Sequence, residues 1–361
     1  MEIGIVGLPN VGKSALFNAL TGSSASSQNY PFCTVEPNIS VVSVYDKRLE
    51  SLARIYETNK ITYASVKFVD IAGLIRGASR GDGLGNKFLA NIREVDAIVH
   101  VVRCFENSEV VHVSGKFNPL EDIETVNLEL ILADIETAER KIEKLTKLLK
   151  SDKNYESELE RWHEILKKLQ KGIPARILSG EYFGVLNFFE LLTAKPVIYV
   201  GNISESSISN IQNDIFFTDV KNKAKSENTS AIAVCAEFEA QISQLPPEDR
   251  FEFMSEAGLK NTGLNCLISV CYNCLGLISF LTAGKPEVRA WSIKKGTKAP
   301  QAAGKIHSDM ERGFIRADIV SFENLIKCGS LTIAREKGYV SSEGKDYVMR
   351  DGDVALFKFN V

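Results

Sequence analysis

The residues best suited to chemistry stand near the start of the chain, in Gly7-Leu8-Pro9-Asn10-Val11-Gly12-Lys13-Ser14. Their spacing fits the phosphate-binding pattern G-x-x-x-x-G-K-[ST]. Glycines let the backbone wrap a phosphate with its N–H groups, Lys13 can reach the outer phosphates, and Ser14 can ligate Mg²⁺. We therefore expect a nucleoside triphosphate site. The alternative is a glycine turn that happens to carry Lys-Ser. The residues expected to bind phosphate are Asn10, Val11, Gly12, Lys13, Ser14 and Ala15.

Two further motifs downstream complete a triphosphate site of the switch type. Thr34 lies between two prolines and is predicted to be a second ligand of the Mg²⁺. Asp70-Ile-Ala-Gly73 follows a predicted strand, where Asp70 can hold Mg²⁺ through water and the N–H of Gly73 can meet the γ-phosphate. An ordinary loop threonine is the alternative for Thr34. The glycine-rich residues 74–85 then have the composition of a loop that changes conformation.

The elements around these motifs alternate between strand and helix, which predicts a doubly wound, mostly parallel α/β sheet. Residues 121–171 carry apolar residues at helical spacing with a polar break at 151–154, so a helical hairpin inserted in the sheet domain is expected. A helix near 264–280 precedes short alternating strands, which predict a small β-rich domain. The predicted domains are 1–125 with 194–280 for nucleotide binding, 126–193 for the hairpin, and 281–361.

Composition places the chain among ordinary globular proteins of the cytoplasm. Of its 361 residues, 44% are hydrophobic and 25% charged, and its seven cysteines have no disulfide-framework spacing. No apolar run reaches the length of a membrane span. Cys271 and Cys274 have C-x-x-C spacing, but apolar residues around them recur at helical intervals. We therefore predict a core helix there; a zinc or redox site is the alternative.

Taken together, the motifs resemble those of the YchF branch of the Obg-like P-loop ATPases. The resemblance extends over essentially the whole chain and implies a nucleotide domain, a helical insertion and a C-terminal α+β TGS domain of β-grasp-like form. Its residues are the loop 7–14, the motifs 31–38, 68–74, 83–86 and 100–105, and the C-terminal Asp351-Gly-Asp353 and Phe357–Val361.

The base-recognition motif departs from that of guanine-specific proteins. Where those carry N-K-x-D, this chain has Asn202-Ile203-Ser204-Glu205. The lysine is lost and the carboxylate is one methylene longer, so the hold on guanine should be weakened, while an Asn amide can pair with adenine. Asn202, Ile203 and Glu205 are the residues expected at the base, with Glu205 turned elsewhere. The resemblance implies ATP as the preferred nucleotide and GTP as the weaker one.

In Ras-type enzymes a glutamine directly after the D-x-x-G motif orients the attacking water. In this chain that position is Leu74, which cannot do so. The resemblance implies either slow intrinsic hydrolysis or help from elsewhere, with Lys13, Asp70 and Gly73 as expected catalytic residues. One candidate helper is K⁺ held by Asn10. Another is His112, for which a structural histidine is the alternative, while His100 in a buried strand is expected to be structural.

The predicted partner is the translation apparatus. Residues 281–361 carry 14 Lys and Arg against 10 Asp and Glu, a mildly basic balance that suits a phosphate-rich surface. The densest basic and aromatic group combines Trp291 with Lys294, Lys295, Lys298 and Lys305. We expect a monomer that contacts the ribosome, at its large subunit and rRNA, without membrane or DNA. The alternatives are a GTPase of the same fold and a non-hydrolysing RNA-binding scaffold that uses nucleotide as effector.

Overall fold

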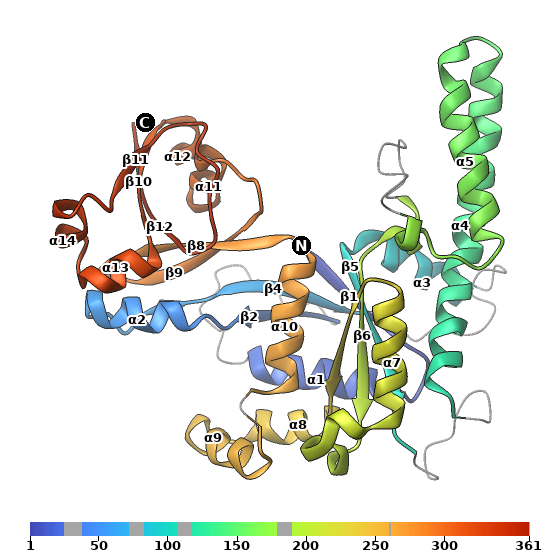
Figure 1. Cartoon of the computed structure of the whole chain (residues 1–361), viewed down its shortest axis with the longest axis horizontal. Helices are drawn as coiled ribbons and strands as arrows, with labels where there is room; N and C mark the ends of the chain where they lie inside the picture. Colours follow the sequence, from blue (N-terminus) through green and yellow to red (C-terminus); the bar gives the residue numbers. More distant parts are fainter. Residues whose placement is uncertain (25–37, 72–82, 107–116, 179–189, 260, 361) are drawn as a thin grey trace. The chain divides into compact units, whose positions relative to one another are not determined.

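The computed structural model describes residues 1–24, 38–71, 83–106, 117–178, 190–259 and 261–360 (Figure 1). They form two compact units. The first holds Met1–Val42 and Lys67–Leu267, and the second holds Ser43–Val66 and Ile268–Val361. The second unit therefore includes a segment from the N-terminal part of the chain. The sequence-based domain boundaries remain predictions.

The first unit is built on a six-stranded sheet. In sheet order its strands are β2 (Ile39–Val44), β4 (Ala64–Asp70), β1 (Glu2–Val6), β5 (Ala97–Cys104), β6 (Val197–Ile203) and β7 (Ser230–Val234). Parallel pairing runs from β4 through β1, β5 and β6 to β7. Every residue of β5 and β6 is buried, as in central strands covered on both faces. The predicted mostly parallel α/β sheet is confirmed.

The strand order reverses at β1, because strands that follow it in the chain are added on opposite sides of it. The chain adds β4 on one side of β1 and β5 on the other. In open α/β sheets, ligands bind outside the carboxyl ends of the strands at such a switch point. The loop of residues 7–12 follows the carboxyl end of β1 and is therefore placed for binding.

Helices cover both faces of this sheet. Gly201 and Asn202 are adjacent on β6, so they face opposite sides. A Cβ on Gly201 would lie 2.6 Å from Cδ2 of Phe217 in α7 (Ile215–Ser226), whereas Asn202 accepts a hydrogen bond from the first backbone N–H of α8 (Ala236–Gln244). A Cβ on Gly22 of α1 (Lys13–Ser24) would lie 2.9 Å from Oγ of Ser243, so α1 packs on α8. The other helical segments are α3 (Gly83–Glu94), η4 (Ala175–Leu178), η6 (Leu192–Ala194), η7 (Glu205–Asn213), α9 (Pro247–Glu256) and α10 (Gly263–Cys274).

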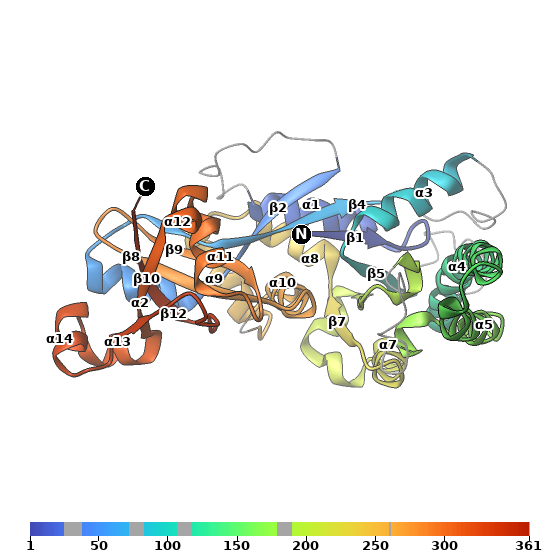
Figure 2. The ribbon, with the colours of Figure 1, turned by 90° about the horizontal axis from the view of Figure 1, so that it is seen from above.

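The helical insertion is an antiparallel hairpin. α4 (Pro119–Leu149) and α5 (Glu156–Leu169) lie side by side and are seen nearly end-on in Figure 2, with the short η3 (Lys153–Tyr155) between them. Asn118 caps α4 by accepting from the N–H groups of residues 120 and 121, and Pro119 supplies the first helical turn. The predicted hairpin and its polar break are confirmed. Its core consists of Ile131, Ala138, Leu145, Trp162, Ile165, Leu169, Ala175, Leu178 and Leu191.

Two buried polar clusters fix the hairpin where it leaves the sheet. The carboxylate of Asp134 accepts from the backbone N–H groups of Leu192 and Thr193 and from the Thr193 hydroxyl, at 2.6–2.8 Å. Arg176 donates to Oε2 of Glu227 at 2.8 and 3.0 Å. The same Arg176 also reaches the Oδ1 of Asn127 and the Tyr199 hydroxyl. The hairpin is thus joined to α7 and β6 through groups shielded from water.

The second unit is built on a mixed sheet. In sheet order its strands are β11 (Ser341–Glu343), β10 (Phe314–Ser321), β12 (Asp353–Phe359), β8 (Leu277–Ala283), β9 (Val288–Lys294) and β3 (Ile61–Thr62). β12 pairs with β10 in antiparallel and with β8 in parallel orientation. The helices are α2 (Lys47–Tyr56), α11 (Ala299–Ile306), α12 (Ser308–Arg312), α13 (Phe322–Cys328) and α14 (Leu331–Glu336). The C-terminal α+β character is confirmed, whereas the TGS type of the domain stays a prediction.

Arg48 accounts for the presence of α2 in this unit. Its guanidinium donates to Oδ2 of Asp351 at 2.8 Å and to both oxygens of Asp46. Oδ1 of Asp351 in turn accepts from the N–H of Ser279 on β8 at 2.8 Å. A charged network therefore links α2, β8 and the segment before β12.

One predicted element is wrong in its extent. The helix expected near 264–280 is α10, which ends at Cys274, and Leu277 to Ala283 form β8 instead. Gly276 has a φ of 63°, a left-handed conformation that ends helices readily. Cys271 and Cys274 do lie on this helix, and within the described ranges no group of three His, Cys, Asp or Glu side chains could hold a metal. None of the helices in the described part of the chain is long and apolar enough to cross a membrane.

Candidate nucleotide-binding site

The loop between β1 and α1 has the backbone that phosphate binding requires. Asn10 and Gly12 have φ values of 65° and 93°, and the N–H of Leu16 closes the first helical turn on the Gly12 carbonyl at 3.0 Å. Left-handed residues curl successive N–H groups toward one side, and the N-terminus of α1 adds its dipole. The loop can therefore serve as an anion cradle.

The two motif glycines are required for space as well as for conformation. A Cβ on Gly7 would lie 2.7 Å from the carbonyl oxygen of Val101 on β5 and 2.9 Å from Cγ2 of Val11. A Cβ on Gly12 would lie 2.1 Å from Nδ2 of Asn202. Any side chain at either position would push the loop away from the sheet.

Lys13 and Asp70 meet at this end of the sheet. Asp70 ends β4 directly beside Ile5 of β1, and its Oδ1 contacts Nζ of Lys13, the first residue of α1. The two side chains are only 11% and 18% exposed. Ser14 follows in the first turn of α1 and is exposed. An ammonium and a carboxylate are therefore in contact beside the cradle, and a serine follows Lys13 in the first turn of α1. These are the types of group that a triphosphate with Mg²⁺ needs.

Asn202 joins the phosphate loop to a second loop. Its Nδ2 donates to the carbonyl of Val11 at 3.0 Å, and its Oδ1 accepts from the N–H of Ala236 at 3.0 Å. The side chain is buried, with 6% exposed. This bridge between the phosphate loop and the start of α8 was not anticipated from the sequence, because neither backbone partner carries a side-chain signal.

The other residues of the base motif lie in different environments. Ile203 is buried at the end of β6, with 2% exposed, whereas Glu205 is exposed at the start of η7. Burial raises the pKa of the neighbouring Cys235 thiol, with backbone N–H groups of α8 opposing that change and the Glu205 charge adding to it. Cys235 is therefore kept as a neutral thiol beside the base motif.

His100 is a core residue, as the sequence suggested. It is 2% exposed, its ring lies 5.5 Å from that of Tyr199, and burial and then Arg176 lower its pKa to about 3. A histidine with this pKa stays neutral near pH 7. Four residues with predicted roles, Thr34, Gly73, Leu74 and His112, lie outside the described residues.

The comparisons with known proteins agree with this geometry. Residues 2–147 match the family model of the 50S ribosome-binding GTPase, MMR_HSR1, and residues 277–360 match YchF-GTPase_C, described as a protein of unknown function. The Ribosome-binding ATPase YchF of Bacillus subtilis is 48% identical, covering 100% of both chains. The protein of the same name from Escherichia coli O157:H7 is 48% identical over 100% of this chain and 99% of its own.

A solved structure extends the likeness to three dimensions. The Schizosaccharomyces pombe YchF GTPase has a TM-score of 0.90 and 36% identity, covering 99% of this chain and 97% of that one. Both units of the present chain are thus included in the match. With full-length relatives at this identity, the chain belongs to the YchF family.

Proposed function

We propose that this chain is a Mg²⁺-dependent ATPase that binds the ribosome and acts as a nucleotide-controlled switch in translation. The observation that carries the nucleotide site is the meeting of Lys13 and Asp70 beside a glycine-bounded anion cradle. The partner comes from relatives that are named ribosome-binding ATPases. We place the protein in the cytoplasm, as a monomer with no DNA or membrane partner.

In this proposal each residue has a definite task. The backbone of residues 10–15 and the ammonium of Lys13 hold the phosphates, and Ser14 and Thr34 ligate the Mg²⁺. The ion supplies charge neutralisation of the phosphate oxygens. Asp70 holds the ion's water shell, and Gly73 meets the γ-phosphate. Because Lys13 and Asp70 contact each other, nucleotide with Mg²⁺ would compete for both partners of this ion pair.

The base preference is proposed as ATP over GTP. Relatives carry the name ATPase, whereas the matched solved structure carries the name GTPase, so the names do not decide between them. The buried Ile203 cannot supply the lysine stem that packs on guanine, and Glu205 is exposed at the start of η7. Asn202 is proposed to line the base while bridging the two loops that bound it.

Calorimetric titration of the full chain with ATP and with GTP, each with Mg²⁺, tests this preference. We expect ATP to bind at least about tenfold more tightly, a difference of ~1.4 kcal/mol. Equal or tighter GTP binding would identify a GTPase of the same fold. Multiple-turnover phosphate release then separates an enzyme from a scaffold that uses nucleotide only as effector, for which no turnover is expected with or without ribosomes.

We propose that hydrolysis is slow because Leu74 cannot orient the attacking water, and that another group assists the reaction. The two candidates are His112 and a K⁺ ion held by Asn10. Asn10 lies in the phosphate loop and has a left-handed backbone conformation. Phosphate release compared in K⁺ and Na⁺, and in His112→Ala, distinguishes them. Equal rates in the two salts remove the cation, and an unchanged rate in the variant removes the histidine.

Ribosome contact is proposed to involve the large subunit and rRNA. Lys294 and Lys295 are exposed, whereas Lys298 pairs with Asp346 at 2.7 Å. Co-sedimentation with separated ribosomal subunits across a salt series is the test, because phosphate contacts weaken as salt rises. We expect binding to the large subunit that falls with salt. Absence of co-sedimentation at low salt would contradict the proposal.

A further inference from the structure

On one side, the C-terminal strand of the second unit pairs with its neighbour β8 at one position only. β12 pairs with β10 from Asp353 to Phe359, but its pairing with β8 is limited to Val354 and Leu281. β8 ends at Ala283, whereas β12 continues to Phe359. Within the described residues no strand pairs with this side of β12 beyond Val354. Since backbone groups of a strand point alternately to its two sides, the edge presents N–H and C=O groups ready for another strand.

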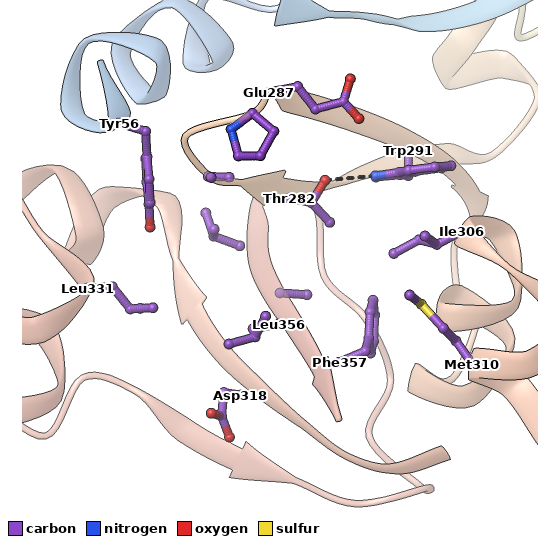
Figure 3. A pocket seen from close by; sticks show the side chains of 15 residues that line it. Tyr56, Thr282, Glu287, Trp291, Ile306, Met310, Asp318, Leu331, Leu356 and Phe357 are labelled. Carbon is purple, nitrogen blue, oxygen red and sulfur yellow. Dashed lines mark hydrogen bonds between the residues drawn. The ribbon is translucent and has the colours of Figure 1, made fainter. Parts of the chain in front are cut away.

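A groove of about 420 Å³ runs along this edge. Its lining includes Thr282, Ala283 and Gly284 at the end of β8 and residues 354–357 of β12. Figure 3 labels Thr282 from the first group and Leu356 and Phe357 from the second. The volume lies within the range of about 300–1,000 Å³ that is usual for ligand-binding pockets. The groove therefore has room beside the strand edge for a bound segment.

The groove has an apolar half on each face of β12. Consecutive residues of the strand point to opposite faces. On one face Phe357 lies with Trp291 and Met310, and on the other Leu356 lies with Leu331 and Tyr56 (Figure 3). A strand added to the edge would send its side chains alternately into these two halves, which is how edge-adding peptides gain specificity.

The walls of the groove are fixed by their own contacts. Nε1 of Trp291 donates to Oγ1 of Thr282 at 3.0 Å, drawn as a dashed line in Figure 3. The guanidinium of Arg289 stacks 3.9 Å from the centroid of the Trp291 ring. A wall that is already ordered loses little conformational entropy when it binds.

The charges of the groove are compensated within the protein. Glu287 lies 3.3 Å from Nζ of Lys60 and accepts from the Thr62 hydroxyl at 3.4 Å. Asp318 accepts from Arg335 at 2.9 Å. A charged occupant would have to compete with these pairs, and a phosphate would face the two carboxylates. The groove therefore suits an uncharged apolar segment.

We propose that the second unit binds an extended, uncharged apolar segment of a partner polypeptide, which adds as a strand to the free edge of β12. Main-chain hydrogen bonds to residues 355–359 hold it, and its consecutive side chains enter the halves lined by Trp291 and by Leu331.

The test uses the full chain and a capped peptide with the sequence of residues 278–283, Ile-Ser-Phe-Leu-Thr-Ala. That sequence is uncharged and belongs to the strand with which β12 already pairs at Leu281. Hydrogen exchange should slow in the segment 353–360 when the peptide is added. A peptide N-methylated at alternate residues keeps its side chains but loses strand hydrogen bonds, so it should bind at least about tenfold more weakly.

Two matched variants locate the binding. Leu356 and Ile315 are exposed aliphatic residues on neighbouring strands, at 43% and 57%, and only Leu356 lines the groove. Leu356→Asp should weaken peptide binding at least about tenfold, and Ile315→Asp should leave it unchanged. The proposal is overturned by absence of peptide binding, by equal binding of the N-methylated peptide, by equal effects of the two variants, or by protection of 353–360 with oligouridine in place of the peptide.

Discussion

The side-chain amide of Asn202 fills the space that a Cβ on Gly12 would need, since that Cβ would lie 2.1 Å from its Nδ2. The same amide holds the carbonyl of Val11 and the N–H of Ala236. Asn202 of the base motif therefore holds the phosphate loop through its hydrogen bond to the Val11 carbonyl. A change on either side of this contact should alter both loops.

Gly12→Ala should abolish most nucleotide binding, because the new methyl group displaces Asn202 and the backbone φ of 93° disfavours any side chain. We expect an affinity loss of at least about tenfold, measured by calorimetry. Gly172→Ala is the matched control, since Gly172 also has a positive φ of 76° but nothing lies within 4 Å of its added Cβ. It should cost about 1 kcal/mol of stability and leave binding unchanged. Wild-type affinity in Gly12→Ala would refute this account of the contact.

Asp70→Asn should remove the Mg²⁺ dependence of nucleotide binding. The neutral amide no longer attracts the hydrated ion, and Lys13 loses its ion-pair partner and is released toward the phosphates. Titration with and without Mg²⁺ should show the enhancement by Mg²⁺ falling about tenfold or more. Asp96→Asn, at the opposite end of the sheet where Asp96 accepts from the N–H of Glu2, should keep the enhancement intact. A full Mg²⁺ effect in Asp70→Asn would exclude the proposed role.

Arg176→Met should destabilise the first unit by about 3–5 kcal/mol, because the Glu227 carboxylate is buried at 3% exposure and would lose its guanidinium partner. It would keep the ammonium of Lys223 at 3.4 Å and the hydroxyl of Tyr199, which donates to Oε2 at 2.9 Å. The double variant Arg176→Met with Glu227→Met should recover most of that loss in urea unfolding. Lys147→Met is the comparison, since the Lys147–Glu143 pair is about 70% exposed on both sides. It should change stability by less than about 0.5 kcal/mol. Equal losses of unfolding free energy in Arg176→Met and Lys147→Met would contradict the argument that burial makes the Arg176–Glu227 pair more important for stability.

Glu239 should make stability fall as pH rises. Burial raises its pKa to about 7, although N–H groups of residues 263 and 264 favour the carboxylate. A carboxyl group that binds its proton more tightly when folded contributes most below its unfolded pKa of 4.5 and loses that contribution up to about pH 7. Relative to wild type, Glu239→Gln should therefore gain roughly 2–3 kcal/mol between pH 5 and 8. Glu237→Gln, an exposed glutamate on the same helix, should show no such gain. A pH-independent difference between Glu239→Gln and wild type would contradict the burial argument.

Local patterns predicted the elements that position the phosphate loop. The β-branched run before Gly7 and the G-x-x-x-x-G-K-S spacing are signals within a dozen residues, and the strand, loop and helix form as expected. The hairpin of α4 and α5 was predictable for the same reason, because its apolar residues repeat at helical spacing. The end of α10 was missed, since the left-handed Gly276 is one glycine in an otherwise apolar run.

Long-range polar contacts were not predictable from the sequence. Arg48 and Asp351 are 303 positions apart, and nothing near either residue indicates that α2 belongs with the C-terminal strands. Asn202 was predicted at the base, but its bonds to two backbone groups depend on how the end of β6, the phosphate loop and the start of α8 come together. Such pairs are fixed by tertiary packing, and a single sequence carries no local trace of them.

The length of α4 gives the hairpin a mechanical property. Its 31 residues form one rod of roughly 46 Å, capped by Asn118 at the end next to the sheet and joined to α5 at the other. The buried hydrogen bonds of Asp134 to Leu192 and Thr193 hold α4 partway along its length, so the part that extends beyond them is residues 135–149, roughly 22 Å long. A rotation of about 5° at Asp134 would move the far end of the helix by roughly 2 Å, because displacement grows with length along a rigid helix. The length of the hairpin beyond Asp134 therefore determines how far its tip would move for a given rotation at that anchor.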